Sequence, residues 1–498
     1  MTKHDGRRDF IKNTTLATLG TLAGAQAARA SSGPELARPE VTRDAPEPLP
    51  PAAARKAAEA MRPFEEFSRW QPSYGWPLDS PHYVGKLVPG LREPGLPPVP
   101  FETPDLDKVP WKIVDGRKEY HLYCQPVSRE LLPGYRMNFF GYNGSLPGPA
   151  IEAVQGDRIR IVVHNELPEP TTVHWHGLEL PVDMDGVPFL VQDPIMPGDS
   201  FAYEYDLHQA GTFFYHSHMP MQEAFGMAGF FIIHPAATWE PRVDRDFGLM
   251  FQNFQIGPNT TVPDAMAMDW NWQAINGRSG PFTTPLVIKH GQRVRIRVVD
   301  FSPQQHHPIH IHGHTFWVTG HEGSRIPYSA WIPRNNTLVG VAQGTDFEFV
   351  ANNPGDWLLH CHMVHHMMNH MTEQVGPRIR QQTPLATFKA DLQSRPNVSF
   401  DHENPAFDVV GYPEMMHMHA YSDEAIRAIE SRRECRGLRP QWYKAVKGLM
   451  TFFRVLPEDL YNLVMHSDEP VPPGYVFEEI KRRRKEYERK HPATELGR

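Results

Sequence analysis

Short runs of alternating apolar and polar residues recur through the middle of this chain. Clear examples are RIRIVV at 158–163 and VRIRVV at 294–299. Runs of this kind are bounded by Gly, Pro or Asp, and none has the period of an amphipathic helix. Because alternation places every second side chain on one face, the pattern predicts half-buried strands and an all-β fold.

The strand pattern occurs twice. PAIEAVQGDRIRIVVHN at 149–165 resembles PLVIKHGQRVRIRVVD at 285–300. PGDSFAYEYDLHQAGTFFYHSHM at 197–219 likewise resembles QGTDFEFVANNPGDWLLHCHM at 343–363. Repeated units of short strands and turns are typical of β-sandwiches, so we predict two Greek-key sandwich domains.

The flanks read differently. Residues 31–110 are Pro-rich and predict an extended arm, whereas helix-like stretches at 422–435 and 477–490 predict a partly helical tail. The expected organisation is a signal peptide at 1–30, the arm at 31–110, sandwich domains at 111–240 and 241–385, and a C-terminal extension at 386–498.

The N-terminus predicts export. GRRDFIK at 6–12 precedes a mild apolar run and a small-residue site at 28–30. Paired Arg, a moderate apolar region and a cleavage site indicate a twin-arginine signal. The run is too short for a stable membrane span, so we expect a periplasmic or extracytoplasmic protein with no membrane span.

Composition narrows the class further. The net charge of −8 gives no basic footprint for nucleic acid. The chain has three Cys. Cys124 and Cys435 could pair, or each could be a buried free thiol, and we predict no disulfide framework.

The run HCHMVHHMMNHM at 360–371 carries the most chemistry. Cys361, His366 and Met371 offer a thiolate, an imidazole and a thioether, which with one more His is the ligand set of a blue-copper centre. On a strand, His360 and His362 point away from Cys361. One strand could therefore link a copper on one face with copper on the other.

Other histidines come in HxH pairs, which place two imidazoles on one face of a strand and suit copper. A single pair is as readily a surface or core feature, but four pairs ending strand patterns indicate shared metal sites. The four pairs are His174 with His176, His216 with His218, His310 with His312, and His360 with His362, and the further histidine is His307.

The repeat distinguishes the two domains. The aligned pairs are Thr171 with His307, Ser217 with Cys361, Gln222 with His366 and Met227 with Met371. The first domain therefore lacks the thiolate and both imidazoles, which predicts one blue site per chain, in the second domain. Met227 is either a remnant of a lost site or core packing.

Taken together, these motifs resemble those of the multicopper oxidases. LPEPTTVHWHG, MDGVPFLVQDPI and GTFFYHSHM resemble the family's first domain, and HPIHIHGH with HCH…H…M resembles its last. The resemblance covers residues 112–380. Most members have three cupredoxin domains, so this chain is similar to the two-domain subgroup with its type 1 copper in domain 2.

The resemblance implies about four coppers per chain, since blue and trinuclear sites occur together in the family. By position, the type 1 copper would be bound by His307, Cys361, His366 and Met371. The type 2 copper would be bound by His174 and His310. The type 3 pair would be bound by His176, His216, His218, His312, His360 and His362.

Acidic groups near the cluster are also implied. Asp185 of MDGVP matches a carboxylate that helps to protonate oxygen intermediates in relatives, although it could instead be a turn residue before Gly186. Many relatives carry a second acid where this chain has Val364, so its proton path must differ.

The implied activity is a copper-dependent oxidase. Single electrons from a phenolic compound or a reduced metal ion such as Cu(I) would enter at the type 1 copper, and O₂ would be reduced to water at a trinuclear cluster. An axial Met371 rather than Leu implies a lower potential, which favours easily oxidised phenols or Cu(I). The cluster MMHMH at 415–419 is a further, weak indication of Cu(I).

Two-domain relatives build the cluster between the first domain of one subunit and the last of the next, so the resemblance implies a head-to-tail homotrimer. Two other classes share parts of the pattern. A two-domain copper nitrite reductase has its blue site in domain 1, whereas here the Cys lies in domain 2. A non-catalytic periplasmic copper-binding or tolerance protein would keep the ligands without turnover, and O₂ uptake separates it from an oxidase.

Overall fold

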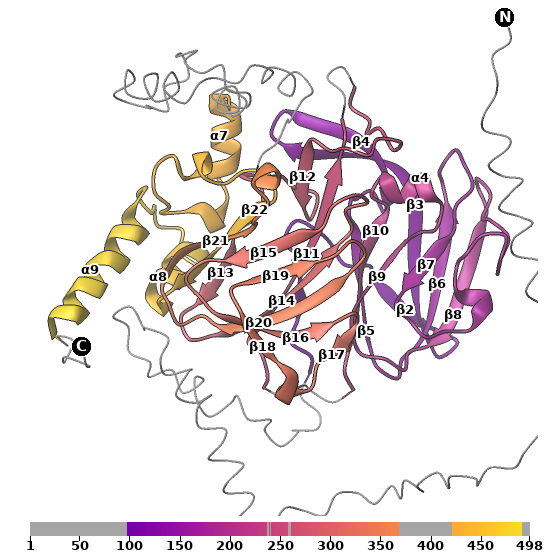
Figure 1. Ribbon diagram of the computed structural model, residues 1–498, viewed down its shortest axis with the longest axis horizontal. Coiled ribbons are helices and arrows are strands. Elements are labelled where there is room, and N and C mark those ends of the chain that lie inside the picture. The colour runs from indigo at the N-terminus through magenta and orange to yellow at the C-terminus, as the bar shows by residue number, and fades with distance from the viewer. Residues whose placement is uncertain (1–96, 237–238, 240, 257–259, 368–420, 491–498) are drawn as a thin grey trace, which may run out of the picture. The chain divides into compact units, whose positions relative to one another are not determined.

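The computed structural model describes residues 97–236, 239, 241–256, 260–367 and 421–490. These residues form two β-sandwiches (Figure 1), which confirms the predicted all-β, Greek-key fold. The predicted signal peptide, the first part of the Pro-rich arm and the MMHMH cluster lie outside the described residues, and those expectations stay predictions.

The first sandwich pairs a five-stranded with a four-stranded sheet. The five-stranded sheet contains β2 (Trp111–Val114), β3 (Arg117–Leu132), β4 (Tyr135–Tyr142), β6 (Arg158–Asn165) and β8 (Ser200–Asp206). The four-stranded sheet has the order β5 (Gly148–Val154), β10 (Ala228–His234), β9 (Gly211–Ser217) and β7 (Val173–His176). A core that includes Ile161, Trp175 and Phe231 fills the space between them.

The second sandwich is built on the same plan. Its larger sheet contains β1 (Phe101–Glu102), β11 (Arg245–Phe254), β12 (Trp272–Ile275), β14 (Arg293–Asp300), β16 (Phe316–His321), β17 (Ser324–Arg325), β18 (Ile332–Arg334) and β20 (Gly344–Val350). Its smaller sheet has the order β13 (Leu286–Lys289), β22 (Met450–Leu456), β21 (Gly355–Cys361), β15 (His307–Ile311) and β19 (Asn336–Val339).

Strand β22 comes from the region predicted to be a C-terminal extension. It pairs parallel with β13 and antiparallel with β21. In the first sandwich, β10 pairs parallel with β5 and antiparallel with β9. The two smaller sheets therefore share one topology, and β22 fills in the second sandwich the place that β10 fills in the first.

Alternation predicted β6 well, because Ile159, Ile161 and Val163 are buried whereas the residues between them are at least partly exposed. Strand β14 differs, because every one of its residues is buried. Its arginines are held by buried carboxylates: Arg297 Nε donates to Asp246 at 2.8 Å and Arg295 Nε donates to Glu348 at 3.1 Å. A charged side chain is buried at low cost only when it is paired in this way.

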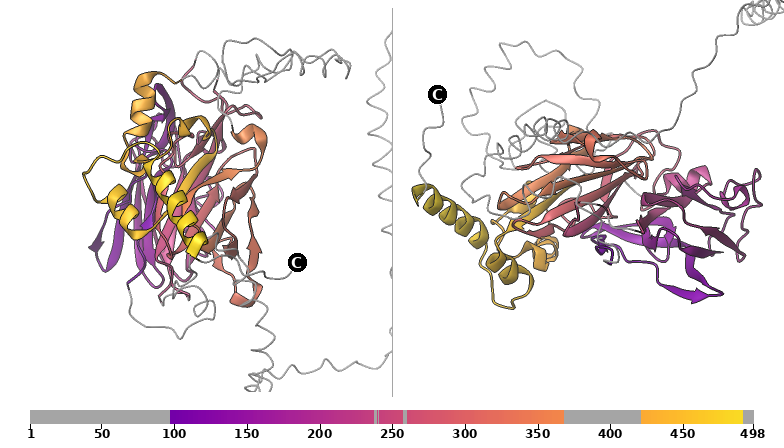
Figure 2. Two further views of the ribbon diagram at one scale, coloured as in Figure 1. Left: turned by 90° about the vertical axis from the view of Figure 1, so that its left-hand side faces the viewer. Right: turned by 90° about the horizontal axis from the view of Figure 1, so that it is seen from below.

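Helices are few and mostly short. They are η1 (Val182–Met184), α4 (Pro220–Ala224), η2 (Tyr328–Ala330), η3 (Val364–Met367), α7 (Asp423–Glu430), η4 (Arg433–Cys435), η5 (Trp442–Lys444), α8 (Glu458–Met465) and α9 (Tyr475–Lys490). Figure 2 shows α8 and α9 in yellow beside the second sandwich, where Leu460 and Val476 pack against Val287 of β13. Among the described residues, no helix is both long and apolar enough to cross a membrane.

Candidate metal centre

Three groups of side chains bring together donor atoms that suit a metal. Within each group the donor atoms lie within 4.8 Å of one another. The groups are His174, His176 and His216; His310, His312 and His360; and His307, Cys361 and His366. All nine were named as candidate ligands from the sequence, and the structure gathers them in one group of the first domain and two groups of the second.

The His–Cys–His group is fully buried in the second sandwich. His307 begins β15, Cys361 ends β21 and His366 lies on η3. The Nδ1 atoms of His307 and His366 are 2.9 Å apart, and Cys361 Sγ is 3.2 Å from His366 Nδ1. Three donor atoms thus converge on one point, with two imidazoles and one thiol, which is the donor set of a blue-copper site.

The surroundings of this group fix its rings. His307 Nε2 and Ser302 Oγ are hydrogen-bonded at 2.7 Å, which leaves Nδ1 for a metal. The Trp270 ring lies edge-on to His366, with centroids 4.6 Å apart. Such outer contacts orient metal ligands and tune the bound ion. Neither Ser302 nor Trp270 was predicted, because loops rather than strand spacing bring them in.

Burial sets the protonation of the group. It lowers the pKa of His366 to about 4 and the pKa of His307 well below its usual value, so both imidazoles are neutral at pH 7. Burial also raises the pKa of the Cys361 thiol to about 12. A thiolate here therefore requires a cation that displaces the proton, as copper does. Met371, predicted as the fourth ligand, lies outside the described residues.

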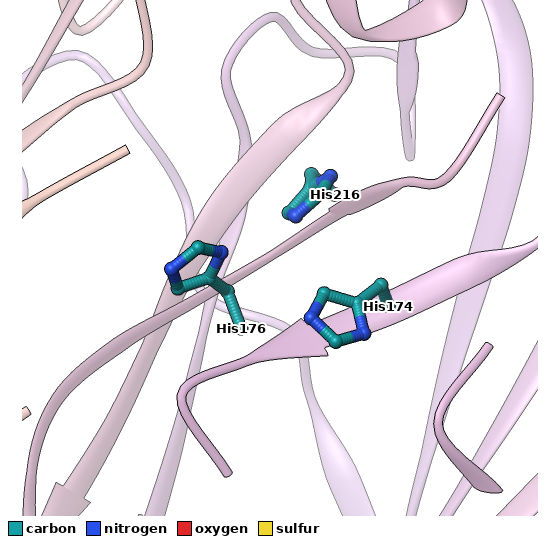
Figure 3. A group of neighbouring side chains, drawn as sticks. All are labelled: His174, His176 and His216. Carbon is teal, nitrogen blue, oxygen red and sulfur yellow. The ribbon is translucent and has the colours of Figure 1, made fainter. Parts of the chain in front are cut away.

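Figure 3 shows the first His group, with three rings gathered around one space. His174 and His176 come from β7 and His216 from β9, and His174 faces His216 directly across the two strands. His218 joins them, with its ring centroid 5.4 Å from that of His174. The structure therefore gathers all four predicted first-domain histidines.

The second His group mirrors the first. His310 and His360 are paired across β15 and β21. His312 Nε2 lies 3.1 Å from His360 Nε2, and the His362 ring centroid is 5.5 Å from that of His310. Since Ile309, Leu359 and Cys361 belong to the sandwich core, alternation turns these histidines to the outer face of the sheet.

Backbone carbonyls orient four of these rings. Nδ1 of His174 donates to Asp185 O at 2.7 Å, and Nδ1 of His216 donates to Ser217 O at 2.9 Å. In the second group, Nδ1 of His310 donates to Asn335 O and Nδ1 of His360 donates to Cys361 O. A proton on Nδ1 leaves Nε2 free as a lone-pair donor, so these rings are set up for metal binding.

Burial keeps three of the clustered imidazoles neutral as well. With help from neighbouring histidines, it lowers the pKa of His176 to about 4, of His216 to about 3 and of His360 to about 4. Neutral imidazole is the form that binds a metal ion. The residues present therefore fit copper in all three groups.

Asp185 reaches the first His group through a tight turn. Its carboxylate Oδ1 lies 3.5 Å from His174 Nδ1. Gly186, with φ of 85°, follows it, and a Cβ at Gly186 would lie 1.9 Å from Val173 O. Only glycine lets this loop approach β7 so closely. Asp185 is thus both a turn residue and a neighbour of a candidate ligand.

A second carboxylate near the histidines was not predicted. Glu223 on α4 has Oε2 3.7 Å from His216 Nδ1, and burial raises its pKa to about 7. Its place shortly after the HSH pair was the only signal in the sequence. Val364, at the position where many relatives carry an acid, is 57% exposed.

The first domain holds hydrogen bonds where the second holds metal donors. Thr171 Oγ1 and Ser217 Oγ both donate to Gln222 Oε1 at 2.7 Å, and all three residues are buried. A network of hydroxyls and an amide satisfies its own polar atoms and offers no soft ligand. One blue site per chain, in the second domain, stays a prediction.

The three cysteines are free. Cys124, Cys361 and Cys435 are each buried and unpaired within the described part of the chain. Cys124 lies on β3 in the first core, whereas Cys435 packs in a cluster with Leu438 and Val446. Cys124 and Cys435 thus act as small apolar side chains.

Paired sandwiches with a buried His–Cys–His group define a cupredoxin-type copper protein. Multicopper oxidase domain families match residues 124–238 and 256–381. Both matched stretches thus resemble multicopper oxidase domains, and the chain is similar to laccases.

Individual relatives match part of the chain. Laccase-2 from Botryotinia fuckeliana is 31% identical over 246 residues, which are 45% of this chain and 41% of that protein. Copper resistance protein A from Escherichia coli is 41% identical over 112 residues, 22% of this chain and 18% of that protein. A solved blue copper oxidase from Nitrosomonas europaea is 28% identical, with a TM-score of 0.48 over 51% of this chain and 82% of its own. The chain spans about two fifths of the length of its first curated relatives.

Proposed function

We propose that this protein is a copper-dependent oxidase that takes single electrons from a small donor and reduces O₂ to water. One observation carries the proposal. The described residues contain one buried His–Cys–His group and two groups of four histidines, and Cys361 of the first is a chain neighbour of His360 and His362 of another. Blue copper would supply one-electron transfer, and a three-copper cluster would supply the four-electron reduction of O₂.

The residues divide this work by position. His307, Cys361 and His366 would bind the electron-accepting copper inside the sandwich. Cys361 is bonded through the backbone to His360 and His362, whose side chains lie on the outer face of the sheet. A covalent path therefore crosses the sheet between the two kinds of site. The Nδ1 hydrogen bonds to carbonyls hold the outer histidines with Nε2 presented.

The two four-histidine groups supply complementary halves of one cluster. Among the described residues, no hydrogen bond or ring contact joins them. His216 contacts Phe301, which packs with Met250 and Val299 on the side of the larger sheet of the second sandwich. The other group lies on the outer face of the smaller sheet, so the core of that sandwich separates them. A complete cluster therefore calls for a second chain.

A head-to-tail ring satisfies this requirement. If the first domain of one subunit meets the second domain of the next, each contact contains one full set of eight histidines. Heterologous contacts of this kind either close into a ring or grow without limit. A homotrimer, as implied for two-domain relatives, is the closed arrangement we propose.

Complementation between two inactive variants tests the shared cluster. His176→Ala removes a ligand from the first-domain half, and His312→Ala removes one from the second-domain half. Each alone should consume no O₂ with a methoxyphenol donor. Co-expressed in equal amounts, they should recover about one quarter of wild-type activity, because a quarter of the contacts in mixed rings join two intact halves.

The matched control is co-expression of His174→Ala with His176→Ala. Both changes damage the same half, so no contact can be intact and no activity should return. Light scattering and copper analysis should show mixed trimers with copper in each preparation. A fully active, copper-replete monomer, or a mixed trimer without recovery, contradicts the shared cluster.

Asp185 is the proposed proton donor to reduced oxygen. Its carboxylate lies beside His174 and is one third exposed, so it contacts both the histidine group and solvent. A positioned acid speeds steps in which protons and electrons arrive together. Glu223, beside His216 on the other side of the group, is a second acid within reach of the same space.

Two exposed methionines favour Cu(I) as an electron donor in addition to phenols. The loop before Trp270 carries Met266 and Met268, which are 75% and 90% exposed. Trp270 touches His366, and Gln304 Nε2 donates to Ala267 O at 2.7 Å, which fixes the loop over the His–Cys–His group. Thioethers are soft ligands that suit Cu(I). Similarity to both a laccase and a copper resistance protein is compatible with either donor.

A further inference from the structure

The two smaller sheets can be compared residue by residue, because strand pairing fixes their registers. In the first sandwich, Ala228 at the start of β10 pairs with His216 of β9. In the second, Met450 at the start of β22 pairs with His360 of β21. His216 and His360 are matching members of the repeat. Met227 and Leu449, the residues just before β10 and β22, are therefore at equivalent positions.

Hydrogen bonds of the peptide groups confirm this equivalence. Ser217 N donates to Met227 O at 3.1 Å, and Cys361 N donates to Leu449 O at 3.1 Å. Through its own amide, Met227 N donates to Gln222 O at 3.2 Å. Leu449 N donates to His366 O at 2.8 Å.

Each of these residues is thus tied to two residues of its site. Ser217 and Gln222 are the first-domain counterparts of Cys361 and His366. Met227 and Leu449 are both fully buried, and Leu449 belongs to the same core cluster as Cys361. The two backbones follow one path around two corresponding sites.

We propose that Leu449 occupies the axial position of the blue copper, the position that ligand spacing assigns to Met371. The inference rests on the proposed copper site of His307, Cys361 and His366. In the first domain, the residue ten positions after Ser217 is Met227, which enters β10 directly. In the second, residues 362–449 separate β21 from β22, so the residue that enters the strand is no longer ten positions after Cys361.

An axial Leu449 in place of Met371 changes the redox properties of the proposed copper site. A thioether donates weakly along the axis of a blue site and stabilises Cu(II), whereas a leucine side chain donates nothing. With Leu449 in place, copper would be held by two imidazoles and one thiolate only. The reduction potential would be higher than with an axial Met, which is the reverse of the expectation from Met371. Donors that are harder to oxidise then come within range.

Spectroscopy of paired variants tests the assignment. Leu449→Met should lower the reduction potential of the blue centre, measured by redox titration of its visible absorption, and should change its electron paramagnetic resonance spectrum. Met371→Leu should change neither. Leu449→Ile, which keeps an apolar side chain of equal volume, is the matched control and should retain the wild-type potential.

The opposite pattern overturns the proposal. If Met371→Leu raises the potential while Leu449→Met leaves it unchanged, Met371 is the axial ligand. A loss of blue absorption in Leu449→Met with normal circular dichroism and copper content also counts against it, since an added thioether should bind rather than disrupt. Wild-type holoprotein without any blue absorption would instead refute the copper site itself, and with it the proposed function.

Discussion

At the scale of the residue, backbone carbonyls hold the candidate histidine ligands in the tautomer that leaves Nε2 free for a metal. His174, His216, His310 and His360 each give the Nδ1 proton to a carbonyl oxygen, and two of these oxygens belong to Ser217 and Cys361, the next residues along the chain. Carbonyl groups at the ends of strands and in loops therefore fix the tautomer of the rings. This arrangement requires no polar side chain and is consistent with the clustered imidazoles being held by backbone geometry.

Asp185 provides a test of proton supply. Asp185→Asn should keep copper content and blue colour but reduce the turnover of O₂ about 100-fold, which is the usual effect of losing a positioned acid. Oxygen uptake with a saturating donor measures this. Asp183→Asn, at an exposed acid on η1 just before Asp185, is the control and should behave as wild type. Unchanged turnover in Asp185→Asn would leave Asp185 as a turn residue only.

Met266 and Met268 provide a test of donor choice. Replacing both by Leu should reduce kcat/KM for Cu(I) about tenfold, the effect of losing roughly 1.4 kcal/mol of binding, and should leave methoxyphenol oxidation unchanged. Met196→Leu, at a half-exposed methionine of the first domain, is the control. Equal loss with both donors would show that the loop supports the copper site rather than binding Cu(I).

At the scale of the element, ion pairs between side chains help to hold neighbouring strands together. Glu152 on β5 accepts a hydrogen bond from His234 of β10 at 2.7 Å and is paired with Lys108 at 2.5 Å. Burial by itself would raise the pKa of Glu152, but these partners outweigh it and lower the pKa to about 2. The ionised carboxylate therefore helps to hold β5 to β10.

The sign of the pH dependence follows. The pKa of Glu152 is 4.5 in the unfolded chain and about 2 in the folded protein. The carboxylate therefore stabilises the fold fully above pH 4.5, and this contribution is lost as the pH falls toward about 2. Glu152→Gln should lower the free energy of unfolding at pH 7 by about 1–3 kcal/mol and flatten its decline between pH 4.5 and 2. Urea titrations at several pH values measure this, with exposed Glu179→Gln as control. Parallel pH profiles for Glu152→Gln and wild type would contradict it.

The sequence predicts these elements unequally, for physical reasons. HxH spacing on a strand fixes two imidazoles on one face, so four such pairs together, among them His174 with His176 and His310 with His312, indicate metal ligands. Alternation also predicted β6 correctly. Strand β22 could not be predicted as part of the second sandwich, because pairing with β21 depends on residues far apart in the chain. The contacts of Ser302 and Trp270 depend on loops, which carry no periodic signal.

At the scale of the whole molecule, the arrangement of the sandwiches gives the chain its proposed need for a partner. Arg297 bridges the two, donating to Thr212 of β9 and to Asp246 of β11, and Thr212 in turn donates to Asp346. These buried links hold the first domain against the larger sheet of the second. The four histidines of the second domain lie on the outer face of the smaller sheet, where the proposed partner chain would contact them.

Strand β22 also imposes an order on biosynthesis. A sheet cannot gain a strand that has not yet been translated, so the second sandwich stays open between β13 and β21 until residue 456 has left the ribosome. The peptide group of Leu449, which secures both Cys361 and His366, arrives only then. On a ribosome-bound chain, Cys361 is therefore a thiol in an unfinished core, vulnerable to oxidation. The geometry that holds Cys361 and His366 is therefore complete only after β22 has been translated, and a chaperone or reductant that shields Cys361 during that interval would raise the yield of active protein.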